Sequence, residues 1–280
     1  MLKTGIILSD FRYGLSIPER LRALKDAGFD AFFTSLMSPE DTLMTAEEAA
    51  KYGLIYDSVH APFGGAGEIW TGTEKGLALV EKIKATADIC AANGIPYFTL
   101  HAQNCPHFND PAQTVSRFTE EGYRRYLDIT EYAASKGVKA SYENVEFPNL
   151  ELAELLGRLR RDCPEGLAFT WDIGHEHCYP CGTAVTDMFG DLLTGTHIHD
   201  NFGNRDPHVI TWDDDSHVLP FDGTVDFRWV GAELNRLSFN GVLMIELGRS
   251  GAIPWYNNYK AEEWLAEAHT RIMHLNALCE

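Results

Sequence analysis

The sequence of 280 residues has no apolar run long enough to span a membrane, since a transmembrane helix needs about 18 or more consecutive apolar residues. Its first residues, Met1 to Leu8, run directly into a polar segment without a small-residue cleavage site, so we expect no signal peptide. The six cysteines are scattered rather than arranged as a disulfide framework, which is typical of a reducing compartment. We therefore expect a cytoplasmic protein with no membrane contact.

Basic residues are also scarce. The chain has 23 lysines and arginines against 41 aspartates and glutamates, which gives a formal net charge of -18 at pH 7. A protein that binds nucleic acid normally presents a basic face that displaces counterions from the phosphates. We therefore expect a small-molecule partner and no nucleic acid, and the sequence leaves open whether the chain forms a homo-oligomer.

Strand and helix patterns alternate along a chain that is 45% hydrophobic and has no linker or low-complexity segment. Apolar runs predict eight strands, at residues 5–9, 31–36, 55–60, 97–101, 138–145, 167–172, 195–200 and 241–247. Helical spacing predicts helices between them, at residues 16–28, 73–93, 111–136, 150–161, 187–193, 227–237 and 261–278.

This alternation is typical of an α/β protein with a parallel sheet. The number of units predicts a closed (β/α)8 TIM barrel, with residues 1–280 as a single domain. An open, doubly wound sheet is the alternative, but no glycine-rich phosphate-binding loop follows the first predicted strand.

Seven short runs, recurring about every thirty residues, each end in a side chain of a type that binds metals. Their last residues are His60, His101, Glu143, Asp172, His197 to Asp200, His217 (the weakest of the seven as a strand) and Glu246. Carboxylates and imidazoles are costly to bury unless they are paired or coordinate a metal. Because active sites of such barrels lie at the carboxyl ends of the strands, we expect these side chains to converge on one point.

Four of these residues form the central candidate site. Glu143, Asp172, His197 and Glu246 supply three carboxylates and one imidazole, without a thiolate. A mixed oxygen and nitrogen set of this kind suits a divalent ion such as Mn, Mg, Co or Zn. His199 points to the same face of its strand as His197 and is an alternative ligand. Further candidates for a second metal or for substrate binding are His60, His101, His175, Asp215 and His217.

These segments resemble the xylose-isomerase-like TIM barrel superfamily. The resemblance rests on Val59-His60-Ala61-Pro62, Leu100-His101-Ala102, Tyr142-Glu143-Asn144, Trp171-Asp172-Ile173-Gly174-His175, His197-Ile198-His199-Asp200-Asn201, Asp215-Ser216-His217-Val218-Leu219-Pro220 with Gly223, and Ile245-Glu246. It implies that Glu143, Asp172, His197 and Glu246 hold the catalytic ion and that His175 contacts the substrate. His197 is preferred over His199 because it precedes Asp200-Asn201 as the family's ligand does.

The superfamily contains sugar-phosphate isomerases and epimerases, and also DNA-repair enzymes of the endonuclease IV type. The positions of the endonuclease three-zinc cluster have counterparts at His60, His101, Glu143, Asp172, His175, His197, Asp215, His217 and Glu246. A multi-zinc phosphodiesterase is therefore one alternative, and a metal-dependent dehydratase or hydrolase is another. The acidic composition and the inserted segment 202–208 argue against the endonuclease. A degenerate barrel that senses a sugar is disfavoured because all four central ligands are present.

The favoured prediction is an enzyme that isomerises or epimerises a small sugar or related hydroxy-carbonyl compound. The metal would bind the carbonyl oxygen, and Glu143 and Glu246, on opposite sides of the barrel, would each act as a base on one face of the substrate. Predicted substrate-binding residues are His175, Arg205, Trp212 and Trp255. The net charge gives no long-range attraction to an anion, which favours a neutral sugar over a phosphorylated one.

Overall fold

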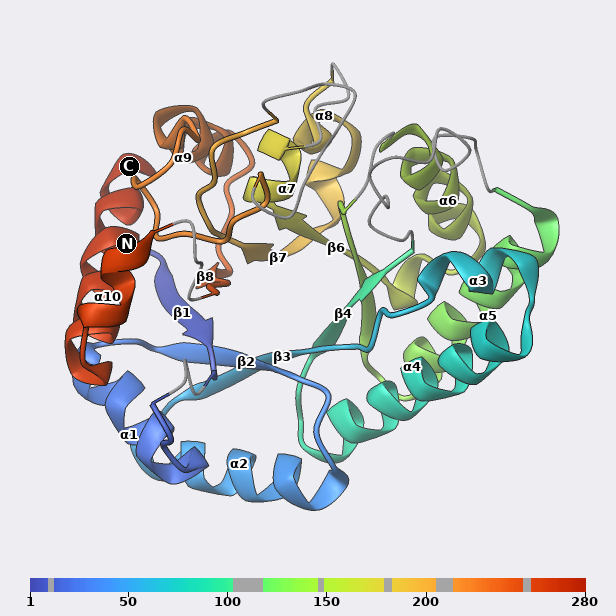
Figure 1. The fold of residues 1–280 in the computed structure, drawn as a ribbon. Helices are drawn as coiled ribbons and strands as arrows, with labels where there is room; N and C mark the ends of the chain where they lie inside the picture. The colour runs from blue at the N-terminus through green and yellow to red at the C-terminus, as the bar shows by residue number, and fades with distance from the viewer. Residues whose placement is uncertain (10–12, 103–117, 146–148, 179–182, 205–213, 249–252) are drawn as a thin grey trace.

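The computed structural model describes residues 1–9, 13–102, 118–145, 149–178, 183–204, 214–248 and 253–280. Its strands are β1 (Lys3–Ile7), β2 (Ala31–Ser35), β3 (Ile55–His60), β4 (Tyr97–His101), β5 (Lys139–Glu143), β6 (Leu167–Asp172), β7 (Leu193–His197) and β8 (Val242–Ile245). They form one parallel sheet in the order β7-β6-β5-β4-β3-β2-β1-β8. Figure 1 shows them as a ring with the helices around its outside.

The ring closes just beyond the end of β7. The amide of Ile198 donates to the carbonyl of Met244 at 2.8 Å, and the amide of Glu246 donates to the carbonyl of Ile198 at 3.0 Å. Sequential strands are neighbours all round the sheet, as expected when each strand is followed by a right-handed crossover. The predicted (β/α)8 barrel is confirmed.

Ten helices lie between and after the strands in the described part of the chain. They are α1 (Ile17–Ala27), α2 (Pro39–Tyr52), α3 (Ala66–Thr71), α4 (Glu74–Ala92), α5 (Glu120–Ser135), α6 (Asn149–Asp162), α7 (Ile173–Cys178), α8 (Val185–Phe189), α9 (Phe227–Arg236) and α10 (Ala261–Leu278). Three 3-10 turns, η2 (Pro164–Gly166), η3 (Gly190–Leu192) and η4 (Pro254–Asn258), accompany them. None of these helices combines the length and the apolar character needed to cross a membrane.

The structure differs from the predicted ranges at several places. Helix α2 was not predicted, nor were the short helices α3 and α7. Helix α2 begins at the proline of a Ser-Pro pair, and the Ser38 hydroxyl accepts a hydrogen bond from the amide of Asp41. The helix predicted over 111–136 begins only at α5, where the Thr119 hydroxyl accepts from the amide of Gly122, and residues 111–117 lie outside the described chain. The run ending at His217, the weakest of the seven as a strand, does not form a strand of the barrel. In the described residues its segment joins the sheet through an antiparallel bridge between Val218 and Asp200.

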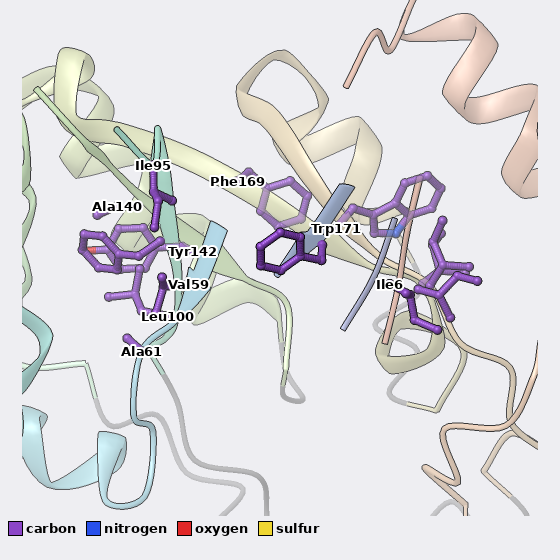
Figure 2. Close-up of a cluster of buried hydrophobic side chains, with 14 of the residues drawn as sticks. Ile6, Val59, Ala61, Ile95, Leu100, Ala140, Tyr142, Phe169 and Trp171 are labelled. Atoms are coloured by element: carbon purple, nitrogen blue, oxygen red, sulfur yellow. The ribbon is translucent and has the colours of Figure 1, made fainter. Parts of the chain in front are cut away.

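Side chains alternate between the outside and the inside of the barrel along each strand, which separates the hydrophobic core under the helices from the candidate site. On β3, β4 and β5, the outward-facing Val59, Leu100 and Tyr142 are buried against the helices, and Figure 2 shows them gathered in one apolar cluster. The next residue on each of these strands points inward and is polar, namely His60, His101 or Glu143. The hydrophobic contacts with the helices therefore fix the strand ends that carry the candidate ligands.

The inside of the barrel is itself divided. Below the ligands of β4, β5 and β6, the buried hydroxyl of Thr170 forms hydrogen bonds with the hydroxyls of Thr99 at 3.2 Å and Ser141 at 2.7 Å. On the opposite side the interior is apolar, with Phe33 of β2 and Met244 of β8 in one buried hydrophobic cluster. Polar and apolar layers thus both support the same end of the barrel.

Candidate metal centre and active site

The central candidate group forms at the carboxyl ends of β5 to β8. Glu143, Asp172, His197 and Glu246 each place one ligand atom within 4.8 Å of the others. Nδ1 of His197 lies 3.2 Å from Oε1 of Glu143 and 3.0 Å from Oε2 of Glu246. Glu143, Asp172 and His197 are buried, and the Glu246 side chain keeps about 18% exposure, so the group opens on the Glu246 side.

Glu143 and Glu246 were predicted to lie on opposite sides of the barrel, but they do not lie across its full diameter. Strands β5 and β8 are three positions apart in the ring, not four. Glu143 and Glu246 instead flank the imidazole of His197 from two sides. They still approach one point from different directions, which is the property that a two-base mechanism needs.

A second group adjoins the first and shares Glu143 with it. His60, His101 and Glu143 offer ligand atoms within the same 4.8 Å limit. Oε2 of Glu143 lies 3.1 Å from Nε2 of His101 and 3.3 Å from Nε2 of His60. The two carboxylate oxygens of Glu143 therefore face different groups, Oε1 toward His197 and Oε2 toward the histidines of β3 and β4.

A third group lies on the other side of Asp172. It consists of His175 from α7, His199 just beyond β7, and Asp215 and His217 from the segment that follows. The carboxylate of Asp215 lies 3.3 Å from Nε2 of His175, 3.5 Å from Nε2 of His217 and 3.7 Å from Nε2 of His199. The rings of His199 and His217 stack with centroids 3.7 Å apart.

The two histidines predicted as alternative ligands, His197 and His199, lie in different groups. His197 joins Glu143 and Glu246, whereas His199 lies in the third group with its Nε2 3.1 Å from Oδ1 of Asp172. Phe33 stacks on the ring of His197 at 4.8 Å and holds it on the glutamate side. The His199 ring lies against Gly174, where a Cβ atom would come within 2.0 Å of it.

The site carries opposite charges in close contact. Burial opposes ionisation of Glu143, but His197 and His101 outweigh it and hold the pKa of the carboxyl group well below its usual value. Burial likewise disfavours the charged form of His197, yet Glu246 and Glu143 raise its pKa well above the usual value. At His217, burial is again outweighed, and Asp215 raises the pKa to about 9. Protons on His197 and His217 thus balance carboxylates that a divalent ion would balance instead.

The donor set fits divalent ions by its chemistry and by its unsatisfied atoms. Within the described chain, the buried Oδ2 of Asp172 and Oδ1 of Asp215 have no hydrogen-bond partner, although an imidazole nitrogen lies within 3.6 Å of each. Buried carboxylate oxygens without partners are rare in folded proteins and are expected where an ion binds. Imidazole and carboxylate ligands without thiolate suit Zn, Mn, Co and Mg.

Several residues have a place in the site that sequence reasoning missed. The carbonyl of Asn144 lies 3.0 Å from Nδ1 of His175 and so orients that ring. Phe63, in the segment after β3, contacts the rings of His60 and His101. Of the predicted substrate-binding residues, Arg205 and Trp212 lie outside the described residues, and so does the side chain of Trp255, whose backbone belongs to η4.

The fold and these groups define a class of protein, a (β/α)8 barrel with a buried imidazole and carboxylate cluster at the carboxyl ends of its strands. A model of the family described as xylose isomerase-like TIM barrel matches residues 21–272. The chain belongs to this family. The resemblance seen in the sequence is thereby confirmed.

Individual relatives were found by sequence and by structure. The chain is 27% identical over 244 residues to the uncharacterized protein y4fM of Sinorhizobium fredii (strain NBRC 101917 / NGR234). The aligned region covers 77% of this chain and 76% of that protein. D-Psicose 3-epimerase with D-tagatose from Clostridium cellulolyticum H10 superimposes with a TM-score of 0.75 over 100% of both chains at 12% identity. A D-tagatose 3-epimerase-like protein gives 0.75 over 99% of this chain and 98% of that one at 19% identity. At these identities, the structural matches show a shared fold.

Proposed function

We propose that this protein is an enzyme, a divalent-metal-dependent isomerase or epimerase of a small sugar or related hydroxy-carbonyl compound. The observation that carries the proposal is the arrangement of Glu143 and Glu246, which reach Nδ1 of His197 from two strands at 3.2 Å and 3.0 Å. Two carboxylates aimed at one point from different sides suit proton removal on one face of a carbon and proton return on the other. The solved structures with sugar epimerase names support the same reaction class.

In the proposed mechanism, Glu143, Asp172, His197 and Glu246 hold the ion. The ion would supply Lewis acidity, which makes a C–H bond next to a carbonyl more acidic. Glu143 and Glu246, with pKa values held low by their imidazole neighbours despite burial, stay ionised at neutral pH and can accept a proton at a carboxylate oxygen. His175, whose Nδ1 faces the carbonyl of Asn144 and whose Nε2 lies 3.3 Å from the Asp215 carboxylate, is the imidazole proposed to contact a substrate hydroxyl.

The substrate is proposed to be small and neutral. The formal net charge of -18 provides no attraction for a phosphorylated sugar or for nucleic acid. Arg205, Trp212 and Trp255 remain predicted substrate-binding residues. The identity of the metal is proposed only as one of Mn, Mg, Co and Zn, since all four accept the donor set.

One observation favours a second candidate function. The three ligand groups adjoin one another through Glu143 and Asp172, an arrangement that would suit neighbouring metals acting on a phosphodiester. A multi-zinc phosphodiesterase of the endonuclease IV type is therefore the alternative. Incubation with duplex DNA that contains an abasic site, at ordinary salt, separates the two, because cleavage would favour this alternative over the isomerase.

A screen in heavy water tests the main proposal. The protein, treated with EDTA and then supplied with Mn, Co, Mg or Zn, is incubated with free and phosphorylated ketoses, and deuterium incorporation is measured by mass spectrometry. We expect exchange of one carbon-bound hydrogen in a free ketose, lost with EDTA and restored by an ion. Exchange confined to phosphorylated sugars would overturn the neutral substrate, and no exchange with any ketose would favour a dehydratase or hydrolase.

A further inference from the structure

An exposed aromatic ring lies at the rim of the candidate centre. The side chain of Phe63 is 48% exposed, whereas His60 and His101 beneath it are only 7% and 6% exposed. Its ring centroid is 4.5 Å from that of His101, tilted by 32°, and 5.4 Å from that of His60, nearly edge-on at 68°. Because both imidazoles contact Oε2 of Glu143, only one side chain separates Phe63 from the central group.

The backbone around Phe63 is held on both sides. Before it, the amide of Ala61 donates to the carbonyl of Thr99 on β4 at 2.8 Å, and Pro62 restricts the chain between them. After it, the Phe63 carbonyl accepts from the amide of Ala66 at 2.9 Å, where α3 begins. These bonds fix the backbone at Phe63, and the contacts with His60 and His101 hold its ring, so less entropy is lost when a ligand binds.

A half-exposed phenylalanine on top of two buried imidazoles has a free face directed away from them. Solvent contact with that face is unfavourable, and covering it with apolar groups contributes binding energy. A ketose has such groups, since its carbon chain presents C–H bonds between its hydroxyls. A phosphate lacks them, and a phenyl ring offers no cation to balance its charge.

We propose that Phe63 is a specificity-determining residue whose free face packs against the C–H groups of an uncharged ketose with more than three carbons, bound at the candidate centre. This inference rests on the proposed function and names the substrate class of the same site. The reacting carbons occupy the region of Glu143 and Glu246, and the remaining carbons extend over His101 toward β3 and β4. A three-carbon ketose lacks these remaining carbons.

The experiment compares substrates of different length on matched variants. Deuterium exchange kinetics are measured with D-tagatose, D-allulose, L-ribulose and dihydroxyacetone for the wild type and for Phe63→Ala, Phe63→Leu and Phe63→Tyr. Leu77→Ala on α4 removes an apolar side chain with similar exposure, 47%, on an outer helix and serves as the control. Bound metal is measured for every variant.

The expected result is a rise of KM for the longer ketoses by roughly 5- to 20-fold in Phe63→Ala, with a much smaller change in kcat. Leu77→Ala should stay near the wild type, and Phe63→Tyr, which keeps the ring, should lose much less than Phe63→Ala. Deuterium exchange into dihydroxyacetone should change much less in Phe63→Ala than exchange into the longer ketoses. Unchanged KM values would overturn the proposal. So would equal losses for dihydroxyacetone or loss of metal, because Phe63 would then act only by packing on His60 and His101.

Failure of the proposed function gives a different result. If the wild type exchanges no ketose, the isomerase proposal fails, and calorimetric titration with D-tagatose then decides the role of Phe63. Binding to the wild type that is weakened in Phe63→Ala supports the contact. Equal binding to both, or no binding to either, overturns it.

Discussion

The side-chain amide of Asn144 forms both hydrogen bonds to the backbone of Asp172. Its Nδ2 donates to the Asp172 carbonyl at 2.7 Å, and its Oδ1 accepts from the Asp172 amide at 2.8 Å. The regular pairing of β5 with β6 ends at Glu143 and Thr170, so Asn144 continues the ladder by one rung where the candidate ligands begin. The carboxylate of Asp172 is thereby fixed relative to Glu143.

Replacing Asn144 by alanine should weaken metal binding. The substitution leaves the buried amide and carbonyl of Asp172 without partners, and loss of such supporting contacts typically lowers metal affinity by about 10- to 100-fold. Metal titration of the Asn144→Ala protein, followed by thermal unfolding, measures both effects. We expect weaker metal binding together with a lower Tm.

Asn276 provides a matched control for this prediction. It is fully buried and forms the same pair of hydrogen bonds, with the backbone of Leu2 at 2.9 Å and 2.7 Å, at the opposite end of the barrel. Asn276→Ala should lower Tm by a similar amount and leave metal affinity unchanged. Equal metal affinities of the two alanine variants would show that Asn144 has no particular role at the centre.

Gly174 should not tolerate alanine. The added Cβ would lie 2.0 Å from the fully buried ring of His199, and overpacking of this kind costs about 1–3 kcal/mol. Gly157 in α6 has no atom near an added Cβ, so Gly157→Ala should stabilise the protein by roughly 0.5–1 kcal/mol through helix propensity. Urea unfolding of both variants tests the pair, and a Gly174→Ala protein as stable as the wild type would contradict the described position of His199.

Asp57 should destabilise the folded protein at neutral pH. Burial raises the pKa of this carboxyl group, and the hydrogen bond from Tyr97 offsets the effect only in part. Because the folded-state pKa lies above the unfolded one, the favourable contribution is present at low pH and is lost as the pH rises through the folded-state pKa. Asp57→Asn keeps an acceptor for the Tyr97 hydroxyl and removes the charge.

The Asp57→Asn protein should therefore unfold at a higher temperature than the wild type at pH 7, by roughly 2–4 °C. The difference should shrink as the pH is lowered below the folded-state pKa of Asp57. Thermal unfolding over a pH series, with both proteins in the same metal state, gives this comparison. An Asp57→Asn protein less stable than the wild type at pH 7 would contradict the view that the buried Asp57 charge destabilises the folded state.

The barrel and the location of its site were predictable for a physical reason. On β4 and β5, apolar residues that cover the outside alternate with polar residues that point inward, and the last residue of each strand, His101 or Glu143, is a metal-binding type. The period of two and the position of the polar end are both local properties. They are visible in the sequence without knowledge of tertiary contacts.

The division of the ligands into groups was not predictable in the same way. His197 and His199 point to the same side of one chain segment. Contacts from distant segments distinguish them, among them the Phe33 ring beside His197 and the Gly174 backbone beside His199. The role of Asn144 depends on the position of Asp172, at the end of the neighbouring strand β6. The exposure of Phe63 depends on which other segments pack against it in the folded chain. Such relationships join segments distant in sequence, so local patterns do not contain them.

The claim that Glu143 and Glu246 exchange protons on two faces of one carbon is tested most directly by Glu143→Gln and Glu246→Gln. Both epimers of a ketose converted by the wild type are incubated separately in heavy water with each variant, after confirming that the metal is still bound. We predict that both variants lose net epimerisation. Each variant should still exchange the carbon-bound hydrogen of one epimer only, and the two variants should act on different epimers. Full turnover by both variants, or exchange of both epimers by each, would contradict the mechanism.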